Sequence, residues 1–275
     1  FQIFLSTIKI SLIAIDEAHC ISEWGHDFRP DYTQLSYLNR TYPDVPIMAL
    51  TATADETTRR DIIAQLDLSD PVELVDSFDR PNIQLHVAPA KDRLERINEF
   101  LDERADESGI IYCLTRKRTE EVAVELEKQG YTAASYHAGM STAERERVQK
   151  SFARDKTQIV CATVAFGMGI DKSNTRWVIH YNLPKNIESY YQEIGRAGRD
   201  GDAAAALLFY TYEDVTRLQR FAISAKRKSV QLAKLERMKE YAEAVTCRRQ
   251  ALLQYFGESY SAPCDACDVC LTEKS

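Results

Sequence analysis

Short runs of β-forming residues alternate along this chain with longer stretches whose apolar residues recur every three or four positions. Parallel strands need long connections, and these connections are usually helices. The alternation therefore predicts an α/β fold in which crossover helices cover a parallel sheet. With 275 residues, the chain is long enough for one large domain or two ordinary ones.

The first part of the chain, up to residue 78, is predicted to be a partial α/β domain. Strands are expected at 12–15, 46–50 and 72–75, with a helix at 56–66 that Asp55 could cap. No periodic apolar face crosses the segment 77–82, in which Pro81 also restricts the residue before it. We place a domain boundary there.

The second part, residues 79–211, is predicted to be a complete doubly wound domain. Its expected strands lie at 109–113, 132–136, 158–162, 177–181 and 205–209. Its expected helices lie at 92–104, 117–129 and 142–152. After residue 211 the strand patterns stop, and a helical segment at 212–275 leads to a cysteine cluster.

The charge of the chain restricts how it could bind a polyanion. Its formal net charge of −7 argues against a uniformly basic surface, so such a contact should be local. Residues 216–240 provide a basic stretch, with many Lys and Arg side chains against Glu236 and Glu240. No apolar segment approaches the roughly 20 residues that span a bilayer, and no secretion signal is visible. We expect a soluble, cytoplasmic protein without a membrane partner.

Two adjacent carboxylates follow the first predicted strand, in the sequence Ile-Ala-Ile-Asp-Glu-Ala-His at 13–19. Ligands of open α/β sheets bind beyond the carboxyl ends of the strands. There Asp16 could hold Mg²⁺ through water, and Glu17 could orient or deprotonate the water that attacks the γ-phosphate of ATP. The alternative is an acidic turn that caps the next helix.

A second group of residues could also face phosphate. Arg196 and Arg199 are three positions apart, so on a helical segment they would share one face and suit the charge on a transferring phosphoryl group. Upstream, a loop at 162–171 contains Gly167 and Gly169, whose backbone N–H groups could bind phosphate oxygens. Either segment alone would more often be an ordinary loop or a solvated face. Together with the acid pair, they favour a nucleotide cleft.

Four cysteines near the end of the chain have the spacing of a metal site. Cys264, Cys267 and Cys270 form two Cys-x-x-Cys steps, and Cys247 lies upstream. Four thiolates suit a closed, structural Zn²⁺ site. Disulfides are the alternative, disfavoured in a protein without a secretion signal. The other three cysteines stand alone and are expected to be buried, reduced thiols.

Three motifs occur in an order that resembles superfamily 2 helicases: Asp-Glu-Ala-His at 16–19, Thr-Ala-Thr at 51–53 and Gln-x-x-Gly-Arg-Ala-Gly-Arg at 192–199. The segment 20–30, Cys-Ile-Ser-Glu-Trp-Gly-His-Asp-Phe-Arg-Pro, narrows the resemblance to the RecQ family of DNA helicases, bacterial type. The resemblance covers nearly the whole chain. It implies a partial RecA-like domain, a complete RecA-like domain and a helical subdomain in which the four cysteines bind zinc.

In the RecQ family the segment 20–30 is an aromatic-rich loop that contacts single-stranded DNA and couples this contact to ATP hydrolysis. By this resemblance, Trp24 and Phe28 would stack on bases, while His26 and Arg29 would donate to phosphates. The alternative is that the two aromatic side chains belong to the core.

The resemblance also implies roles for residues elsewhere. His19, with the segment 51–53, would relay the nucleotide state to the DNA-contacting loops, and Gln192 would join the catalytic set. Asp171 would lie near the nucleotide. The further residues placed near DNA or the interdomain cleft are Arg80, His137 and Thr163.

The resemblance implies an ATP-dependent 3′–5′ DNA helicase of recombination, repair and replication. Its substrates would be single-stranded and junction-containing duplex DNA, in the cytoplasm at the bacterial nucleoid, and a monomer is expected. None of the ten glycines is followed by lysine, so the Gly-x-x-x-x-Gly-Lys-Ser/Thr phosphate loop lies outside this sequence. We expect a core fragment that is weakly active or inactive alone.

Two other functions are compatible with the sequence. One is a non-enzymatic, zinc-stabilised DNA-binding module on a degraded ATPase scaffold, which the acid pair and the arginine pair oppose. The other is an RNA helicase of the Asp-Glu-Ala-His class, which the aromatic-rich loop and the cysteine cluster oppose.

Overall fold

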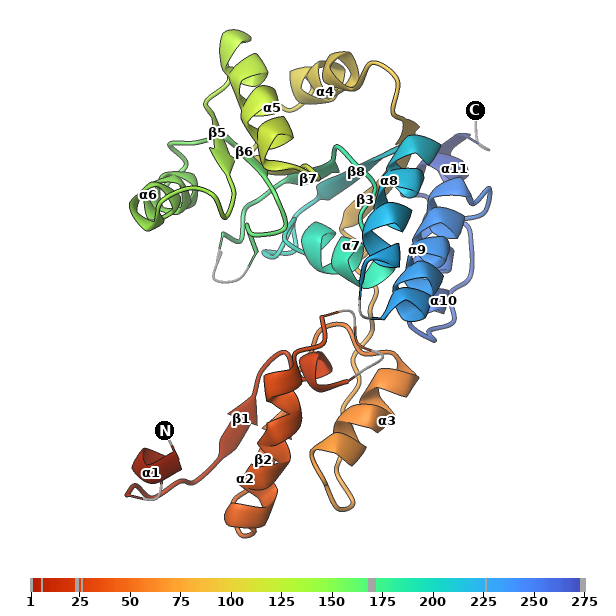
Figure 1. Cartoon of the computed structure of the whole chain (residues 1–275). Helices are drawn as coiled ribbons and strands as arrows, with labels where there is room; N and C mark the ends of the chain where they lie inside the picture. Colours follow the sequence, from red (N-terminus) through yellow and green to blue (C-terminus); the bar gives the residue numbers. More distant parts are fainter. Residues whose placement is uncertain are drawn as a thin grey trace. The chain divides into compact units, whose positions relative to one another are not determined.

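A computed structural model gives the structure of the chain in two compact units (Figure 1). The first comprises residues 1–78 with 254–258, and the second comprises 79–253 with 259–275. The residues that the structure describes are 2–5, 7–22, 25, 27–167, 172–225 and 227–272.

The first unit is built on a short parallel sheet, in which β1 (Ile13–Ile15) pairs with β2 (Ile47–Ala49). Helix α3 (Glu56–Gln65) begins after Asp55, whose carboxylate accepts a hydrogen bond from the Thr58 N–H group at 2.8 Å. This is the predicted N-cap. The remaining elements are α1 (Gln2–Leu5), the 3₁₀ segments η1 (Ala18–Ile21) and η2 (Pro30–Leu35), and α2 (Ser36–Thr41).

The strand predicted at 72–75 does not form. Residues 71–80 are neither helix nor strand, and the Val72 and Leu74 side chains are 87% and 91% exposed. β-branched residues favour a strand only where an adjacent edge can pair with it and a surface can cover it. The residues at 72–75 have a high β-strand propensity, but no strand in the described part of the first unit pairs with them.

The second unit contains a six-stranded sheet in the order β3-β8-β7-β4-β6-β5, in which every pairing is parallel. Its strands are β3 (Ile83–Pro89), β4 (Gly109–Tyr112), β5 (Ala133–Tyr136), β6 (Ile159–Ala162), β7 (Trp177–His180) and β8 (Ala204–Tyr210). Strand β3 was not predicted, although Ile83, Leu85 and Val87 alternate with other residues as strand residues do. The predicted parallel α/β class is confirmed.

Helices cover both faces of this sheet (Figure 1). α4 (Arg93–Asp102) and α5 (Arg116–Lys128) lie on one face, where Ile97 and Leu126 pack in a core around Trp177. The other helices of the sheet region are α6 (Thr142–Ala153) and α7 (Ile187–Ile194). The helical C-terminal part comprises α8 (Tyr212–Ile223), α9 (Lys228–Glu243), α10 (Arg248–Tyr255) and α11 (Asp268–Thr272).

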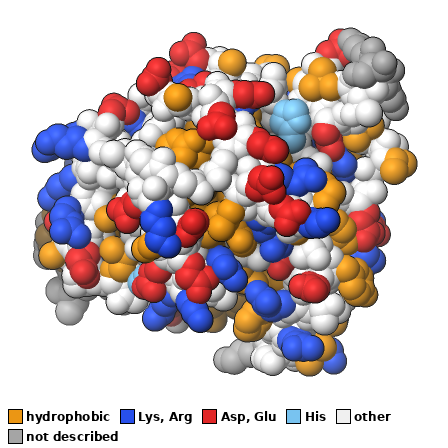
Figure 2. Space-filling model, turned by 90° about the horizontal axis from the view of Figure 1, so that it is seen from above, with side chains coloured by type: hydrophobic (Ala, Val, Ile, Leu, Met, Phe, Trp, Pro, Cys, Tyr) orange, Lys and Arg blue, Asp and Glu red, His pale blue; other side chains and the backbone are white. Residues whose placement is uncertain are grey.

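Charged residues of both signs cover the outer faces of α5 and α6. They form ion pairs one helical turn apart, such as Arg118–Glu121 at 2.8 Å and Lys150–Glu146 at 3.2 Å, and Figure 2 shows acidic and basic side chains interspersed. Exposed pairs of this kind add little to stability. No helix in the described ranges is long and apolar enough to cross a membrane.

Candidate functional site

Asp16 and Glu17 occupy the turn directly after β1. The turn is fixed by backbone hydrogen bonds of 2.9 Å, from the Leu50 N–H group to the Ile15 carbonyl and from the Ala18 N–H group to the Leu50 carbonyl. Glu17 has a left-handed backbone conformation (φ 49°), which costs a non-glycine residue about 1–2 kcal/mol. Asp16 is exposed and the Glu17 side chain is 41% exposed, so both carboxylates are accessible to a ligand.

His19 lies beside this acid pair and is buried. Its Nδ1 atom is 3.3 Å from Glu17 Oε2 and 2.9 Å from Thr51 Oγ1, so an Nδ1–H group could donate to both oxygens. The Thr51 hydroxyl also accepts from the Thr53 N–H group at 3.3 Å. The turn after β1 is therefore connected through His19 to the Thr-Ala-Thr segment after β2, as a relay between these motifs requires.

The aromatic-rich loop packs closely on the backbone of η1. A Cβ atom at Gly25 would lie 2.2 Å from the His19 carbonyl oxygen, so this approach requires glycine. The Arg29 N–H group also donates to the Cys20 carbonyl at 2.9 Å. The acid segment and the loop are thus in direct backbone contact within the first unit.

The side chains predicted to contact DNA in this loop are described only in part. Trp24 and His26 lie outside the described residues. Phe28 is half-buried. The Arg29 guanidinium pairs with Asp27 at 2.8 Å, and this hydrogen bond raises the Arg29 pKa. Both members of the pair are more than 40% exposed, so Arg29 stays accessible from solvent.

In the second unit, Arg196 and Arg199 lie in turns that follow α7, so they do not share the helical face that a continued helix would give them. The helix ends at Ile194, and Gly198 then takes a left-handed conformation with φ 59°. The Gly198 N–H group leaves the helical pattern and donates to the Thr175 carbonyl at 2.8 Å. The physical reason is that glycine adopts positive φ without steric cost. Gln192 lies on α7 and is half-buried.

The structure brings Arg196 against the predicted glycine-bearing loop. Its Nη1 atom donates to the Gly167 carbonyl at 2.6 Å. A Cβ atom at Gly167 would come within 2.9 Å of Nη2. Within the described ranges, the buried Nε atom of Arg196 has no acceptor. Arg199 is exposed, and Gly169 and Asp171 lie outside the described residues.

A buried polar pair that was not predicted joins α7 to strand β7. His180 Nε2 lies 2.7 Å from Glu193 Oε2, and both residues are buried. The His180 ring stacks on Tyr112, and the Tyr190 ring lies 5.1 Å from it. Burial of a carboxylate is tolerated where it is hydrogen-bonded. His180 is the polar residue of the otherwise apolar strand β7, and this contrast in the sequence could have indicated a buried polar contact.

The three other residues predicted near DNA also belong to the second unit. His137 is buried, with Nε2 at 2.9 Å from Glu120 Oε1 and Nδ1 accepting from the Gly139 N–H group. Thr163 is half-buried. The Arg80 guanidinium donates to main-chain carbonyl groups of the turns after α7.

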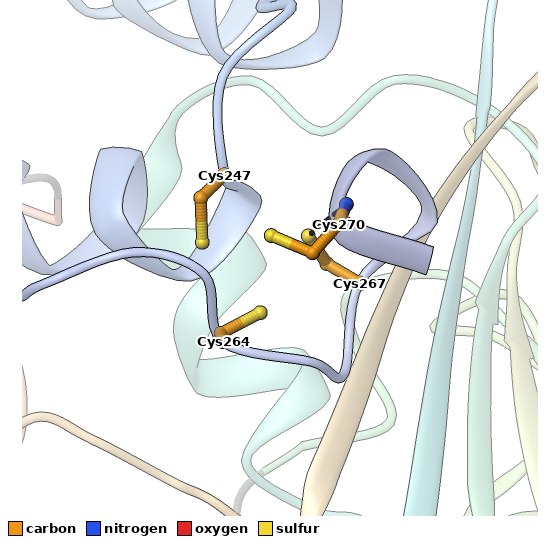
Figure 3. A group of neighbouring side chains, drawn as sticks. All are labelled: Cys247, Cys264, Cys267 and Cys270. Atoms are coloured by element: carbon orange, nitrogen blue, oxygen red, sulfur yellow. Dashed lines mark hydrogen bonds between the residues drawn. The ribbon is translucent and has the colours of Figure 1, made fainter. Parts of the chain in front are cut away.

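The four cysteines of the C-terminal part form a compact cluster (Figure 3). Cys247 precedes α10, Cys264 and Cys267 lie in the loop before α11, and Cys270 lies in α11. All four Sγ atoms lie within 4.8 Å of one another. A tetrahedral zinc with Zn–S bonds of about 2.3 Å separates its sulfur ligands by about 3.8 Å. The donor set and its spacing therefore fit zinc.

The cluster is fixed to the sheet and to α10. The Leu85 N–H group of edge strand β3 donates to the Ala266 carbonyl at 3.0 Å, so the cysteine loop covers an otherwise open edge. The buried Arg248 side chain binds Asp268 through Nε and Nη2 and the Tyr241 carbonyl through Nη1.

The isolated cysteines Cys20, Cys113 and Cys161 are buried and form no disulfide. Burial raises the pKa of Cys20 to about 11 and that of Cys113 to about 12. Such thiols stay protonated at neutral pH and are inert. The predicted burial of these three cysteines is confirmed.

Comparison with known proteins now identifies the class. A DEAD/DEAH box helicase model matches residues 2–62, a helicase conserved C-terminal domain model 92–201, and a RecQ zinc-binding model 212–271. The structure of S. cerevisiae Dbp5 bound to RNA and ADP BeF3 matches with a TM-score of 0.61 and 20% identity, over 80% of this chain and 60% of that one. The fold is that of RecA-like helicase cores.

Sequence relatives narrow the class to a family. ATP-dependent DNA helicase RecQ of Haemophilus influenzae is 52% identical over 98% of this chain and 44% of its own length. RecQ-like DNA helicase BLM of Xenopus laevis is 45% identical over 97% of this chain and 21% of its own length. The chain belongs to the RecQ family of helicases. It spans less than half the length of these two relatives.

Proposed function

We propose that this chain forms the central part of an ATP-dependent DNA helicase that moves 3′ to 5′ and acts in recombination, repair and replication. Its substrates would be single-stranded and junction-containing duplex DNA, bound by a monomer in the cytoplasm at the nucleoid. Family membership and the helicase names of the relatives support this proposal.

The observation that carries the proposal is the placement of His19 within hydrogen-bonding distance of both Glu17 and Thr51. A turn that merely capped a helix would not need this connection. In the proposed enzyme, Asp16 holds Mg²⁺ through water, and Glu17 orients or deprotonates the attacking water. His19 and the Thr51–Thr53 segment pass the state of the nucleotide to the loop that packs on η1.

In the second unit, Arg196 and Arg199 would bind the nucleotide phosphates, together with Gln192 and the loop of Gly167, Gly169 and Asp171. The Nε group of Arg196, without an acceptor in the described part of the chain, supports a ligand role. An arginine that stabilises a transferring phosphoryl group contributes roughly 10³ to 10⁵ in rate.

DNA would be bound by the loop of Trp24, His26, Phe28 and Arg29, and by the other predicted contacts, Arg80, His137 and Thr163. Zinc would hold the segment 212–275 together as a subdomain, because the thiolate–metal bonds supply folding energy. The basic stretch at 216–240 lies in the same segment and would add local contacts to phosphate.

The test is Glu17→Gln in the natural full-length protein, with DNA-stimulated ATPase activity and ATP binding measured separately. We expect ATP binding to persist and kcat to fall by at least about 100-fold, since a positioned base contributes 10²–10⁴ in rate. Glu56→Gln, an exposed glutamate paired with Arg60 on α3, is the matched control. Near-normal hydrolysis by Glu17→Gln would refute the proposed role.

The same ATPase assay distinguishes an enzyme from a DNA-binding module. It is made on this chain alone and on the chain extended upstream. Activity in the extended form only would support the helicase. Activity in neither form, with DNA binding retained, would favour a zinc-stabilised DNA-binding module. Unwinding of RNA in preference to DNA would instead identify an RNA helicase.

A further inference from the structure

The turns that carry Arg196 and Arg199 are held by the guanidinium group of Arg80. Arg80 Nη1 donates to the Gly195 carbonyl at 3.4 Å, and Nη2 donates to the Ala197 and Gly198 carbonyls at 3.1 and 2.9 Å. These carbonyls follow the C-terminal end of α7, where a cation is electrostatically favourable. Because the two nitrogens of one rigid fork bind acceptors on both sides of Arg196, the fork fixes the path of the main chain at that residue.

The main chain at Arg80 is held in turn by Arg249. This side chain is buried. Its Nη1 atom donates to the Arg80 carbonyl at 2.8 Å and to the Asp79 carboxylate, and its Nη2 atom donates to the Ile83 carbonyl at 2.7 Å. A buried guanidinium with three acceptors is costly to disturb, because any acceptor that it loses is left without a donor.

These two arginines connect the proposed phosphate-binding turns to the cysteine cluster. Arg249 lies in the first turn of α10, two residues after Cys247. All the groups in this connection belong to the second unit. The printed hydrogen bonds of both guanidinium groups go mainly to main-chain carbonyls of the second unit. Such bonds fix the geometry of the main chain that they contact.

We propose that Arg80 and Arg249 are positioning residues that act in series: Arg249 holds the Arg80 main chain, and Arg80 holds the turns that aim Arg196 and Arg199 at phosphate. The proposal deepens the proposed function, on which its catalytic consequence rests. It gives Arg80 a positioning role beside the DNA contact proposed for it above.

The test uses Arg80→Lys, Arg249→Lys and the double variant, with amide hydrogen exchange measured at residues 195–199. Lysine keeps the positive charge but lacks the fork. We expect exchange in these turns to accelerate by about tenfold in each single variant. If the two residues act in series, the double variant should exchange no faster than the faster single variant. Arg147→Lys, on the exposed face of α6, is the matched control and should leave these amides unchanged.

Zinc content and steady-state kinetics complete the test. Arg80 contacts no cysteine in the described structure, so the Arg80→Lys variant should bind zinc normally. The amide exchange of this variant at residues 195–199 therefore tests the proposal even if Arg249→Lys loses zinc. In the full-length protein, kcat should fall by about 10- to 100-fold with KM nearly unchanged, because misplaced arginines weaken mainly the transition state.

Two outcomes would overturn the proposal. One is unchanged exchange at residues 195–199 in Arg80→Lys. The other is a double variant whose effects are fully additive. An inactive wild-type enzyme would refute the proposed function alone, since the exchange measurement does not depend on ATP hydrolysis.

Discussion

Gly198 lies between Arg196 and Arg199 and determines the path of the main chain in the turns that carry them. Its φ of 59° is left-handed, and a Cβ atom there would lie 2.3 Å from Asn82 Nδ2 and 2.8 Å from the Asp202 carbonyl. Asn82 donates to the carbonyl groups of both Gly198 and Asp202. A side chain at position 198 would therefore push Asn82 away and break its hydrogen bonds to this turn.

We predict that Gly198→Ala destabilises the protein by about 1–3 kcal/mol more than Gly201→Ala. Both glycines have positive φ, but a Cβ atom at Gly201 would meet nothing within 4 Å. Comparing the two variants therefore separates the steric clash of a Cβ atom at position 198 from the cost of a positive φ, which both variants bear. Thermal unfolding of the two variants measures the difference, and equal melting temperatures would contradict the clash.

At the scale of elements, α8 is attached to the sheet by a buried carboxylate near its N-terminus. Asp214 accepts from Asn182 Nδ2 at 2.9 Å, from the Leu183 N–H group at 3.3 Å and from Arg93 Nη2 at 3.1 Å. Asn182 also accepts from the Leu114 N–H group. Asp214 and Asn182 together thus join α8 and α4 to the segments that follow β4 and β7.

We predict that Asp214→Ala lowers stability by about 3 kcal/mol, because Arg93 and Asn182 lose a buried partner. Glu213→Ala is the control, since Glu213 lies in the same first turn of α8 and is exposed. Both variants lose one negative charge near the helix N-terminus, which is worth less than about 1 kcal/mol. Similar unfolding temperatures for the two variants would show that the buried network contributes nothing.

At the scale of the whole molecule, the cysteine cluster joins segments that are distant in sequence. The loop of Cys264 and Cys267 lies on β3 at the sheet edge, and Arg249 connects α10 to the segment before β3. Metal binding should therefore stabilise the second unit beyond residues 212–275.

We predict that Cys267→Ser, or zinc removal by a chelator, lowers the melting temperature and accelerates amide exchange in β3 as well as in the cysteine loop. Cys267 is fully buried beside Leu85, so the loss of one ligand should free the loop from the strand. Cys161→Ala, in the core of β6, should keep its zinc. Faster exchange in the cysteine loop with unchanged protection in β3 would contradict this prediction, because it would show that zinc binding does not stabilise the strand.

The sequence by itself determined the fold class, the acid pair after β1 and the four cysteines. The fold class is written in a recurring apolar period, the acid pair and the last three cysteines in local patterns of two to seven residues, and Cys247 lies upstream of these cysteines. The strand expected at 72–75 does not form, β3 was not predicted, and the helical segment on which Arg196 and Arg199 would share a face ends before them. The tertiary structure alone decided that Arg80 holds the turns around Arg196, that Arg249 holds Arg80, and that His180 supports α7 through Glu193. The bonds of the two arginines join residues 115 to 170 positions apart, and spacing along a chain carries no information about contacts that only packing creates.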